Sequence, residues 1–541
     1  MKTKSLLFSL CALISFLIAG CCPRNPGINT AITAHGNTDW HIDTAEEFLL
    51  GTDMGGNPSV ANHCPDSWTR RHMHVGLTNT NHFYYDTDLT TPGDDTDTTN
   101  GIDRAMLFFY AGHGSPDSFD TLGNAAEQQY MALGDCEGTE YGLLRYYWQC
   151  SCKVFAHGPY NCTSSTFYYG CPQDFDGSAD SVNMRNVYER WGPVLEPELR
   201  MACGSSTLAW CHEGEMNSIW DNYNNNSFDV ADSFIDGLQV NHNVVPLCIT
   251  RGGFDVTKTP LYDQTFTNQP NDGGSYYHIQ FLSQFATTAP IIAIPKIPEY
   301  LPIYELMPPP LPDPLRQVKF VEMKDFLVSQ DEVKDRGPRV RVNRISGSVY
   351  IRGDRKTEFK KPYLKEGEYI ERAMSIIRKQ GWTEKDFREP QGVRLQIQTM
   401  PIKSKEDIQH FQKNVIVKIK RQITVDGLEI PVLGRGGVMT IQMNNDGTLL
   451  NSSKIWRQIV GIKKKARVKS YKRAYNEALE KLQKHHQAYK LDRWIWGYKE
   501  APGNMKQDEL RIVFLFEFLP INEEMMREHP PRRIEIPGHI D

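Results

Sequence analysis

A proline-rich stretch between residues 290 and 314 divides the chain into two halves of different composition. Its prolines favour an extended polyproline II spacer. Residues 1–290 carry 13 Lys and Arg against 33 Asp and Glu, whereas residues 291–541 carry 47 against 33. A chain of 541 residues is also too long for one ordinary domain. We therefore expect two domains, residues 31–289 and 315–541, joined by a linker at 290–314.

The N-terminus has the pattern of an export signal. Lys2 and Lys4 precede an apolar run, residues 6–17, that is too short to span a bilayer permanently. The run leads into Ile-Ala-Gly-Cys21, which resembles the lipobox of bacterial lipoproteins. This resemblance implies a signal peptide at residues 1–20, lipidation of Cys21 and a tether at residues 21–30. We expect an exported, membrane-anchored protein, at the outer membrane if the host is Gram-negative.

The cysteines are concentrated in the first half of the chain. Nine of the 12 lie from Cys64 to Cys248, and none follows Cys248. Disulfides are therefore expected in an exported protein. Because nine is an odd number, at least one thiol in this region is unpaired or bonded outside it. The sequence leaves the pairing open.

The charge asymmetry has two interpretations. An acidic half followed by a basic half predicts intramolecular docking of two domains that attract each other. The asymmetry is equally compatible with two independent surfaces of different origin. The basic half contains no recognised nucleic-acid motif, so no nucleic-acid partner is expected.

The first half alternates apolar runs with a helix-compatible segment. The runs at residues 105–110, 143–148 and 244–249 are typical of buried strands, and a helix is expected around residues 125–133. This order predicts an α/β sheet with covered faces.

The second half has a different periodicity. Strands are expected in eight segments, helices at residues 367–379 and from Ser470, and a hairpin turn at Asp426-Gly427. The expected strands are 340–345, 348–351, 393–399, 415–425, 428–433, 437–443, 448–450 and 511–518. This is the pattern of a smaller α+β domain.

Two strand ends carry residues suited to catalysis. The first apolar run continues into Ala-Gly-His113-Gly114, and the second into Cys150-Ser-Cys152. His113 and Cys152 are 39 residues apart, enough for one crossover back into the same sheet. A cysteine thiolate beside a histidine base attacks carbonyl groups, and the backbone N–H groups of Gly114 and Cys152 would stabilise the oxyanion.

These motifs resemble those of the caspase-like cysteine peptidases, a group that includes caspases, metacaspases and gingipains. The resemblance covers roughly residues 30–290. It implies a caspase/haemoglobinase fold, a dyad of His113 and Cys152, and a protein or peptide substrate. Cys150 is the alternative nucleophile, and Cys152 is favoured because a small residue precedes it. The alternative function is a catalytically inactive envelope lipoprotein with a binding or structural role.

Other polar residues are weaker candidates. Asp135, Asp174 and Asp176 are candidates for a pocket that accepts Arg or Lys. The loop clusters Asp94, Asp95 and Asp97, and Asp174, Asp176 and Asp180, could hold calcium but lack a complete ligand series. The histidines at 63, 72 and 74 match no zinc spacing, so no metal and no cofactor is expected. His35-Gly36 is expected to lie in a loop.

The basic half resembles, in its order of elements, the PepSY-type propeptide modules of secreted peptidases. The order is strand, Asp-Gly turn, glycine-rich strand and helix, within residues 415–450 and after Ser470. The resemblance implies an inhibitory or chaperone-like partner for the acidic half. The alternative is a generic binding domain.

Overall fold

The computed structural model describes part of the 541-residue chain. The described residues are 31–36, 69–75, 84–85, 89–90, 102, 105–111, 118–121, 124–127, 131–133, 144–150, 155, 187–188, 191–196, 199–205, 215–224, 228–239, 246–262, 266, 271, 273–284, 297–323, 326–330, 339–353, 363–382, 387–388, 390–402, 409–482, 488–503, 505–521 and 532–540. The predicted signal peptide, Cys21 and the tether lie outside these ranges.

The first half is built on a sheet-rich α/β core. Five strands run parallel in the order β2-β1-β3-β6-β7, and β8 and β9 continue the sheet in antiparallel pairing. Their bounds are β1 (Ala31–Gly36), β2 (Thr69–Val75), β3 (Leu107–Ala111), β6 (Tyr146–Cys150), β7 (Met201–Ser205), β8 (Pro246–Gly252) and β9 (Tyr276–Gln284). The three predicted strands are confirmed as β3, β6 and β8, although β8 is antiparallel.

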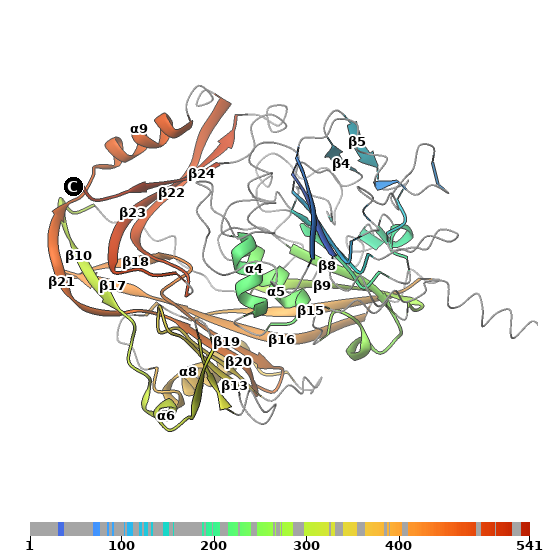
Figure 1. Ribbon diagram of the computed structural model, residues 1–541, viewed down its shortest axis with the longest axis horizontal. Helices are drawn as coiled ribbons and strands as arrows, with labels where there is room; N and C mark the ends of the chain where they lie inside the picture. The colour runs from blue at the N-terminus through green and yellow to red at the C-terminus, as the bar shows by residue number, and fades with distance from the viewer. Residues whose placement is uncertain are drawn as a thin grey trace, which may run out of the picture.

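Both faces of this sheet are covered, which explains why β3 and β6 are apolar at nearly every position. One face packs against the helices α4 (Glu215–Asn224) and α5 (Val230–Gln239), which lie together on the sheet (Figure 1). The other face buries a second cluster that includes Trp191 at the start of the 3-10 helix η6 (Gly192–Val194). A second 3-10 helix, η7 (Val256–Lys258), follows β8.

The helix predicted around residues 125–133 is wrong. Asn124–Glu127 forms the strand β5, which pairs with β4 (Ser118–Thr121). The ladder joins Thr121 to Asn124, so the sequence Leu-Gly connects the two strands. A two-residue connection containing glycine favours a tight hairpin, and this local signal outweighs the helix propensity of the alanines.

The sheet does not end with the first half of the chain. The strand β9 pairs with β15 (Gln391–Pro401), and the path continues through the second half to give 15 strands. The remaining strands are β16 (Gln409–Lys420), β19 (Val438–Asn444), β20 (Leu449–Ile455), β14 (Val349–Arg352), β13 (Arg339–Asn343), β12 (Phe326–Ser329) and β11 (Phe320–Met323). The expected division into two separate sheet domains is therefore wrong, because Leu395 and Ile397 of β15 complete the core of the first half.

A second sheet of seven strands lies beyond the large one. Its order is β17-β18-β22-β23-β10-β21, and β24 pairs with β23. The bounds are β10 (Tyr300–Met307), β17 (Gln422–Val425), β18 (Leu428–Gly434), β21 (Gln458–Arg467), β22 (Tyr489–Glu500), β23 (Glu509–Pro520) and β24 (Arg532–Pro537). The helix α9 (Tyr471–Leu482) packs against this sheet (Figure 1).

The strand β10 falls inside the segment expected to be a polyproline spacer, so that expectation is wrong for residues 300–307. Pro302 lies outside the part of β10 that pairs with β23, which is Tyr304 and Glu305, and its carbonyl accepts a hydrogen bond from the Tyr498 hydroxyl at 2.9 Å. Leu301 and Ile303 on either side are fully buried in the sheet. Their burial outweighs the preference of the prolines for an extended, solvated chain.

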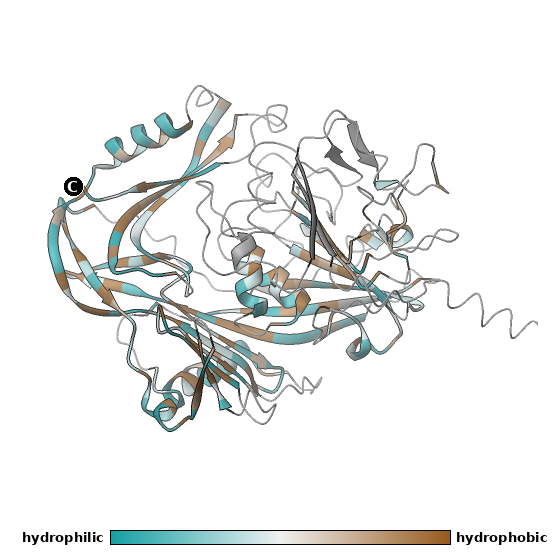
Figure 2. Cartoon of the chain, in the orientation of Figure 1, coloured by the Kyte–Doolittle hydropathy of each residue, from teal (hydrophilic) through white to brown (hydrophobic). Residues whose placement is uncertain are grey.

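Most of the predicted local structure of the second half is confirmed. The two predicted helices are α8 (Glu366–Lys379) and α9, and a short helix α6 (Asp313–Arg316) precedes them. At the predicted hairpin turn Asp426 has φ 50° and Gly427 has φ 81°, as a type I′ turn requires. The long strand β15 alternates between hydrophobic and hydrophilic residues over residues 393–398 (Figure 2), whereas β16 has three consecutive hydrophobic residues at 415–417. On β16, Ile416 faces the α4–α5 core, and Val415 and Val417 face α8.

Candidate functional site

Three central strands of the parallel sheet end in the same row. Gly36 at the end of β1 pairs with Ala111 at the end of β3, and Ala111 pairs with Cys150 at the end of β6. The carboxyl ends of parallel strands are where open α/β sheets place their active sites. The candidate site is therefore this edge, the carboxyl edge, defined by Gly36, Ala111 and Cys150.

The end of β1 could not be recognised from the sequence. The expected loop at His35-Gly36 is wrong, because both residues are the last two of β1, between β2 and β3. The strand order also reverses here: β2 lies on one side of β1, and the next strand in the sequence, β3, lies on its other side. The run Ala-Ile-Thr-Ala is short and weakly apolar, so its position in the sheet could not be read from its composition.

Cys150 is fully buried and disulfide-bonded. A disulfide sulfur is not a thiolate, so Cys150 does not serve as the alternative nucleophile in this state. The other predicted site residues, His113, Gly114 and Cys152, lie outside the described residues. In the sequence, His113 is two residues beyond Ala111, and Cys152 is two residues beyond Cys150.

The chain after β6 returns to the same edge. The amide of Phe155 donates a hydrogen bond of 3.0 Å to the carbonyl of Ser205, the last residue of β7. The Phe155 ring packs over Gly204, where a Cβ atom would lie 2.5 Å from ring carbons. Gly204 therefore admits a buried aromatic ring beside the strand end. The segment containing Cys152 is thus bounded by two described points, Cys150 and Phe155.

A second cluster of polar groups lies where α5 meets β16. The Lys413 ammonium is 1% exposed, and it donates to Asp229 at 2.5 Å, Asp232 at 2.8 Å and the Leu261 carbonyl at 2.6 Å. Asp232 also accepts from Asn414 at 2.9 Å and from two buried glutamine side chains. Burial disfavours the charge on Lys413, but the two carboxylates outweigh it and raise the pKa of the ammonium.

A β-bulge gives Lys413 its direction. In the ladder Leu395 pairs with Asn414 and Gln396 with Gln412, so Lys413 is the extra residue of β16. Such a bulge re-aims a side chain out of the regular alternation. Asp229 is at the same time the N-cap of α5, accepting from the Asp232 amide at 2.8 Å. The break in alternation at Phe-Gln-Lys-Asn was the sequence signal for this cluster.

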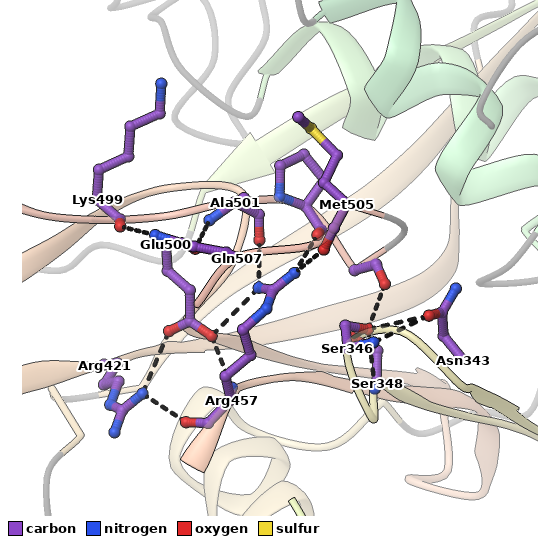
Figure 3. Close-up of polar contacts among 12 residues, drawn as sticks. Asn343, Ser346, Ser348, Arg421, Arg457, Lys499, Glu500, Ala501, Met505 and Gln507 are labelled. Atoms are coloured by element: carbon purple, nitrogen blue, oxygen red, sulfur yellow. Dashed lines mark hydrogen bonds and ion pairs between the residues drawn. The ribbon is translucent and has the colours of Figure 1, made fainter. Parts of the chain in front are cut away.

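A third cluster holds the junction of the two sheets (Figure 3). The Glu500 carboxylate is fully buried, with Arg421 at 3.2 Å and the backbone amide of Arg457 at 2.6 Å. Arg421 lies between β16 and β17, Arg457 between β20 and β21, and Glu500 ends β22. Arg421 and Arg457 lie where the chain passes from the large sheet to the second sheet, and Glu500 ends a strand of the second sheet. Gly436 is required beside them, because its Cβ would lie 2.3 Å from the Ala501 carbonyl.

The arrangement at the junction is structural in character. The Arg457 guanidinium donates to the carbonyls of Ala501 at 2.8 Å and Pro502 at 2.9 Å (Figure 3). Burial raises the pKa of Glu500, and Arg421 and Arg457 oppose that shift. Glu500 is paired with both arginines, and both guanidinium groups also donate to backbone carbonyls, so the contacts tie the two sheets together.

Of the predicted metal and pocket residues, His72 and His74 are among the residues that the structure describes. Within the described ranges no group of His, Cys, Asp and Glu is arranged to hold a metal ion. The aspartates at 94, 95, 97, 135, 174, 176 and 180, and His63, lie outside those ranges. His72 lies on β2 and pairs with Thr33, and His74 pairs with His35.

Comparisons with known proteins identify no family for this chain. No protein-family model matches the chain, and no curated protein matches it. Among solved structures, a similar one is an uncharacterized protein from Eubacterium rectale ATCC 33656, with 8% identity and a TM-score of 0.28. The similarity covers 44% of this chain and 83% of that one. No helix among the described residues is long and apolar enough to cross a membrane.

Proposed function

We propose that the protein is a lipid-anchored, exported, caspase-like cysteine endopeptidase that uses Cys152 as nucleophile and His113 as base. The observation that carries this proposal is the pairing of Ala111 with Cys150 at the carboxyl edge. Paired residues of neighbouring strands lie about 4.8 Å apart. Two residues of extended chain reach at most about 7 Å. His113 and Cys152 are therefore each held within two residues of a pair of neighbouring strand ends, Ala111 and Cys150.

In the proposed reaction, His113, Cys152 and the backbone amides have separate roles. His113 takes the proton of the Cys152 thiol, and the thiolate attacks the peptide carbonyl. The imidazolium then gives its proton to the leaving amine, and water hydrolyses the thioester. The backbone amides of Gly114 and Cys152 stabilise the oxyanion of both tetrahedral intermediates. The acidic first half favours cleavage sites after Arg or Lys.

The C-terminal half is expected to act as an integral part of the fold rather than as a removable propeptide. Its strand β15 pairs with β9 along Val393–Pro401, and Lys413 is buried against Asp229 and Asp232. Removing it would expose both a sheet edge and two carboxylates. A PepSY-like role, if present, would then operate within the intact chain.

The alternative function is a catalytically inactive envelope lipoprotein with a binding or structural role. The disulfide at Cys150 favours it, because it shows that a cysteine of this edge can be bonded. The partner of Cys150 decides between the two functions. If that partner is Cys152, the proposed nucleophile is consumed.

The test is cleavage of peptides containing Arg or Lys by the purified, exported chain, followed by mass spectrometry of the products. We expect cleavage by the wild type, loss of at least about 100-fold in Cys152→Ala and in His113→Ala, and no loss in His410→Ala. His410 is an exposed residue of β16, several strands from the carboxyl edge. Equal activity in Cys152→Ala and the wild type would overturn the proposal.

A further inference from the structure

Two thiols face each other in the core of the first half. Cys203 of β7 pairs directly with Cys248 of β8 in the antiparallel ladder, and their sulfur atoms are 2.7 Å apart. Both side chains are fully buried and both cysteines are free in this structure. We propose that Cys203 and Cys248 are oxidised to a cross-strand disulfide in the exported protein.

The backbone geometry suits this bond. Residues directly opposite each other in an antiparallel pair have Cα atoms about 4.5–5.5 Å apart. Natural disulfides join Cα atoms about 4.4–6.8 Å apart. The sulfur atoms need to approach by only about 0.7 Å to reach a bonded distance of about 2.0 Å. The pairing and the sulfur–sulfur distance are therefore compatible with a disulfide.

The surroundings leave the reduced thiols with little to bind. Burial raises the pKa of both thiols, so they stay protonated as weak S–H donors in the core. The Cys248 thiol, a weak donor, lies 3.9 Å from the Ala231 carbonyl that accepts from it. A disulfide removes both weak donors from this apolar core, which contains Trp148 and Phe234.

The reaction is a thiol–disulfide exchange. The two thiols lose two protons and two electrons, and a disulfide oxidant of the exported compartment gains them and becomes a dithiol. Because both sulfur atoms are fully buried in the folded chain, the exchange takes place during folding, before β7 and β8 are covered by α5. The bond is afterwards shielded from reductants.

The bond would join the parallel part of the sheet to its antiparallel extension. Cys203 pairs in the same row with Trp148, two residues before the end of β6. The disulfide also affects the remaining cysteines. Cys150 and this pair use three of the nine from Cys64 to Cys248, and the partner of Cys150 is one of the others or an earlier cysteine. If it is one of the other six, five remain, and at least one of them has no partner within the region.

The proposal rests on export of the chain and not on peptidase activity, so it is tested by peptide mapping. The full-length protein is exported in a bacterial host, denatured without reductant, alkylated with iodoacetamide and digested. We expect a linked peptide pair containing Cys203 and Cys248, with no alkylation of either before reduction. The same result is expected for Cys152→Ala, which removes the proposed activity.

The matched variant is Cys203→Ala, in which Cys248 becomes alkylated without reduction. If this variant does not fold, alkylation in denaturant still reports the state of Cys248. Alkylation of both cysteines in the unreduced wild type would overturn the proposal and indicate a thiol hydrogen bond. Linkage of either cysteine to a third one would also overturn it.

Discussion

The Lys413 ammonium donates a hydrogen bond of 2.8 Å to the Asp232 carboxylate, across a sequence separation of 181 residues. Asp232 belongs to α5 in the acidic half, and Lys413 is the bulged residue of β16 in the basic half. A second ion pair, Lys418 with Asp236 at 2.5 Å, lies on the same helix. Oppositely charged side chains of the two halves therefore meet in specific contacts between α5 and β16.

Replacement of Lys413 by Met is predicted to destabilise the protein by about 3–5 kcal/mol, because Asp229 and Asp232 would remain buried without their counter-ion. Urea denaturation measures the change. The control is Lys472→Met, at an exposed position of α9, for which the free energy of unfolding should change by less than about 0.5 kcal/mol. Equal midpoints for the two variants would show that the Lys413 cluster contributes nothing.

Replacement of Glu500 by Gln is predicted to loosen the junction of the two sheets. The substitution keeps the size of the side chain but removes the charge that Arg421 and Arg457 share. The expected cost is about 2–3 kcal/mol, that of hydrogen bonds to charged groups. Glu480→Gln on the exposed face of α9 is the control. A thermal shift no larger than the control's would count against this role.

The buried His278 predicts a pH dependence of stability. Its ring nitrogens lie 2.9 Å from the Thr399 hydroxyl and 3.1 Å from the Gly253 carbonyl, and burial lowers its pKa from 6.5 to about 4. Between pH 6.5 and about pH 4, His278 is therefore protonated in the unfolded chain but neutral in the folded chain. Stability should be unaffected above pH 6.5 and should fall on acidification towards pH 4, by up to roughly 3 kcal/mol. The slope should be smaller in His278→Gln, and an unchanged slope would refute the assignment.

A pair of glycine substitutions tests backbone strain without packing effects. A Cβ atom would meet nothing within 4 Å at Gly427 or at Gly367. Gly427 has φ 81°, so Gly427→Ala should cost about 1–2 kcal/mol. Gly367 lies in the first turn of α8, where Gly367→Ala should stabilise by up to about 1 kcal/mol. Denaturation midpoints should move in opposite directions, and a shift in the same direction would contradict the turn assignment.

Local patterns predicted many elements of the fold but not how the halves are joined. The alternation in residues 393–399 and the Asp426-Gly427 turn depend on neighbours in the sequence, and both were found where expected. The pairing of β9 with β15 joins residues more than 100 positions apart, and no periodicity encodes it. β10 was missed because the prolines of residues 290–314 indicate a spacer, whereas the burial of β10 depends on β21 and β23.

The candidate site was predicted in part. The apolar runs before His113 and Cys152 predicted two neighbouring strand ends, and Ala111 and Cys150 are paired. The small residue before Cys152 favoured it over Cys150 as nucleophile, but the sequence did not show that Cys150 is disulfide-bonded. Disulfide pairing depends on which side chains share a face in three dimensions, and that information is absent from the spacing of cysteines.

The most direct test of the peptidase proposal is labelling by a peptidyl electrophile that carries Arg or Lys, with the modified residue located by mass spectrometry in unreduced protein. We predict that Cys152 alone is labelled and that the label disappears in His113→Ala but persists in His410→Ala. A mapped disulfide between Cys150 and Cys152, with no labelled cysteine, would contradict the proposal and leave the binding role.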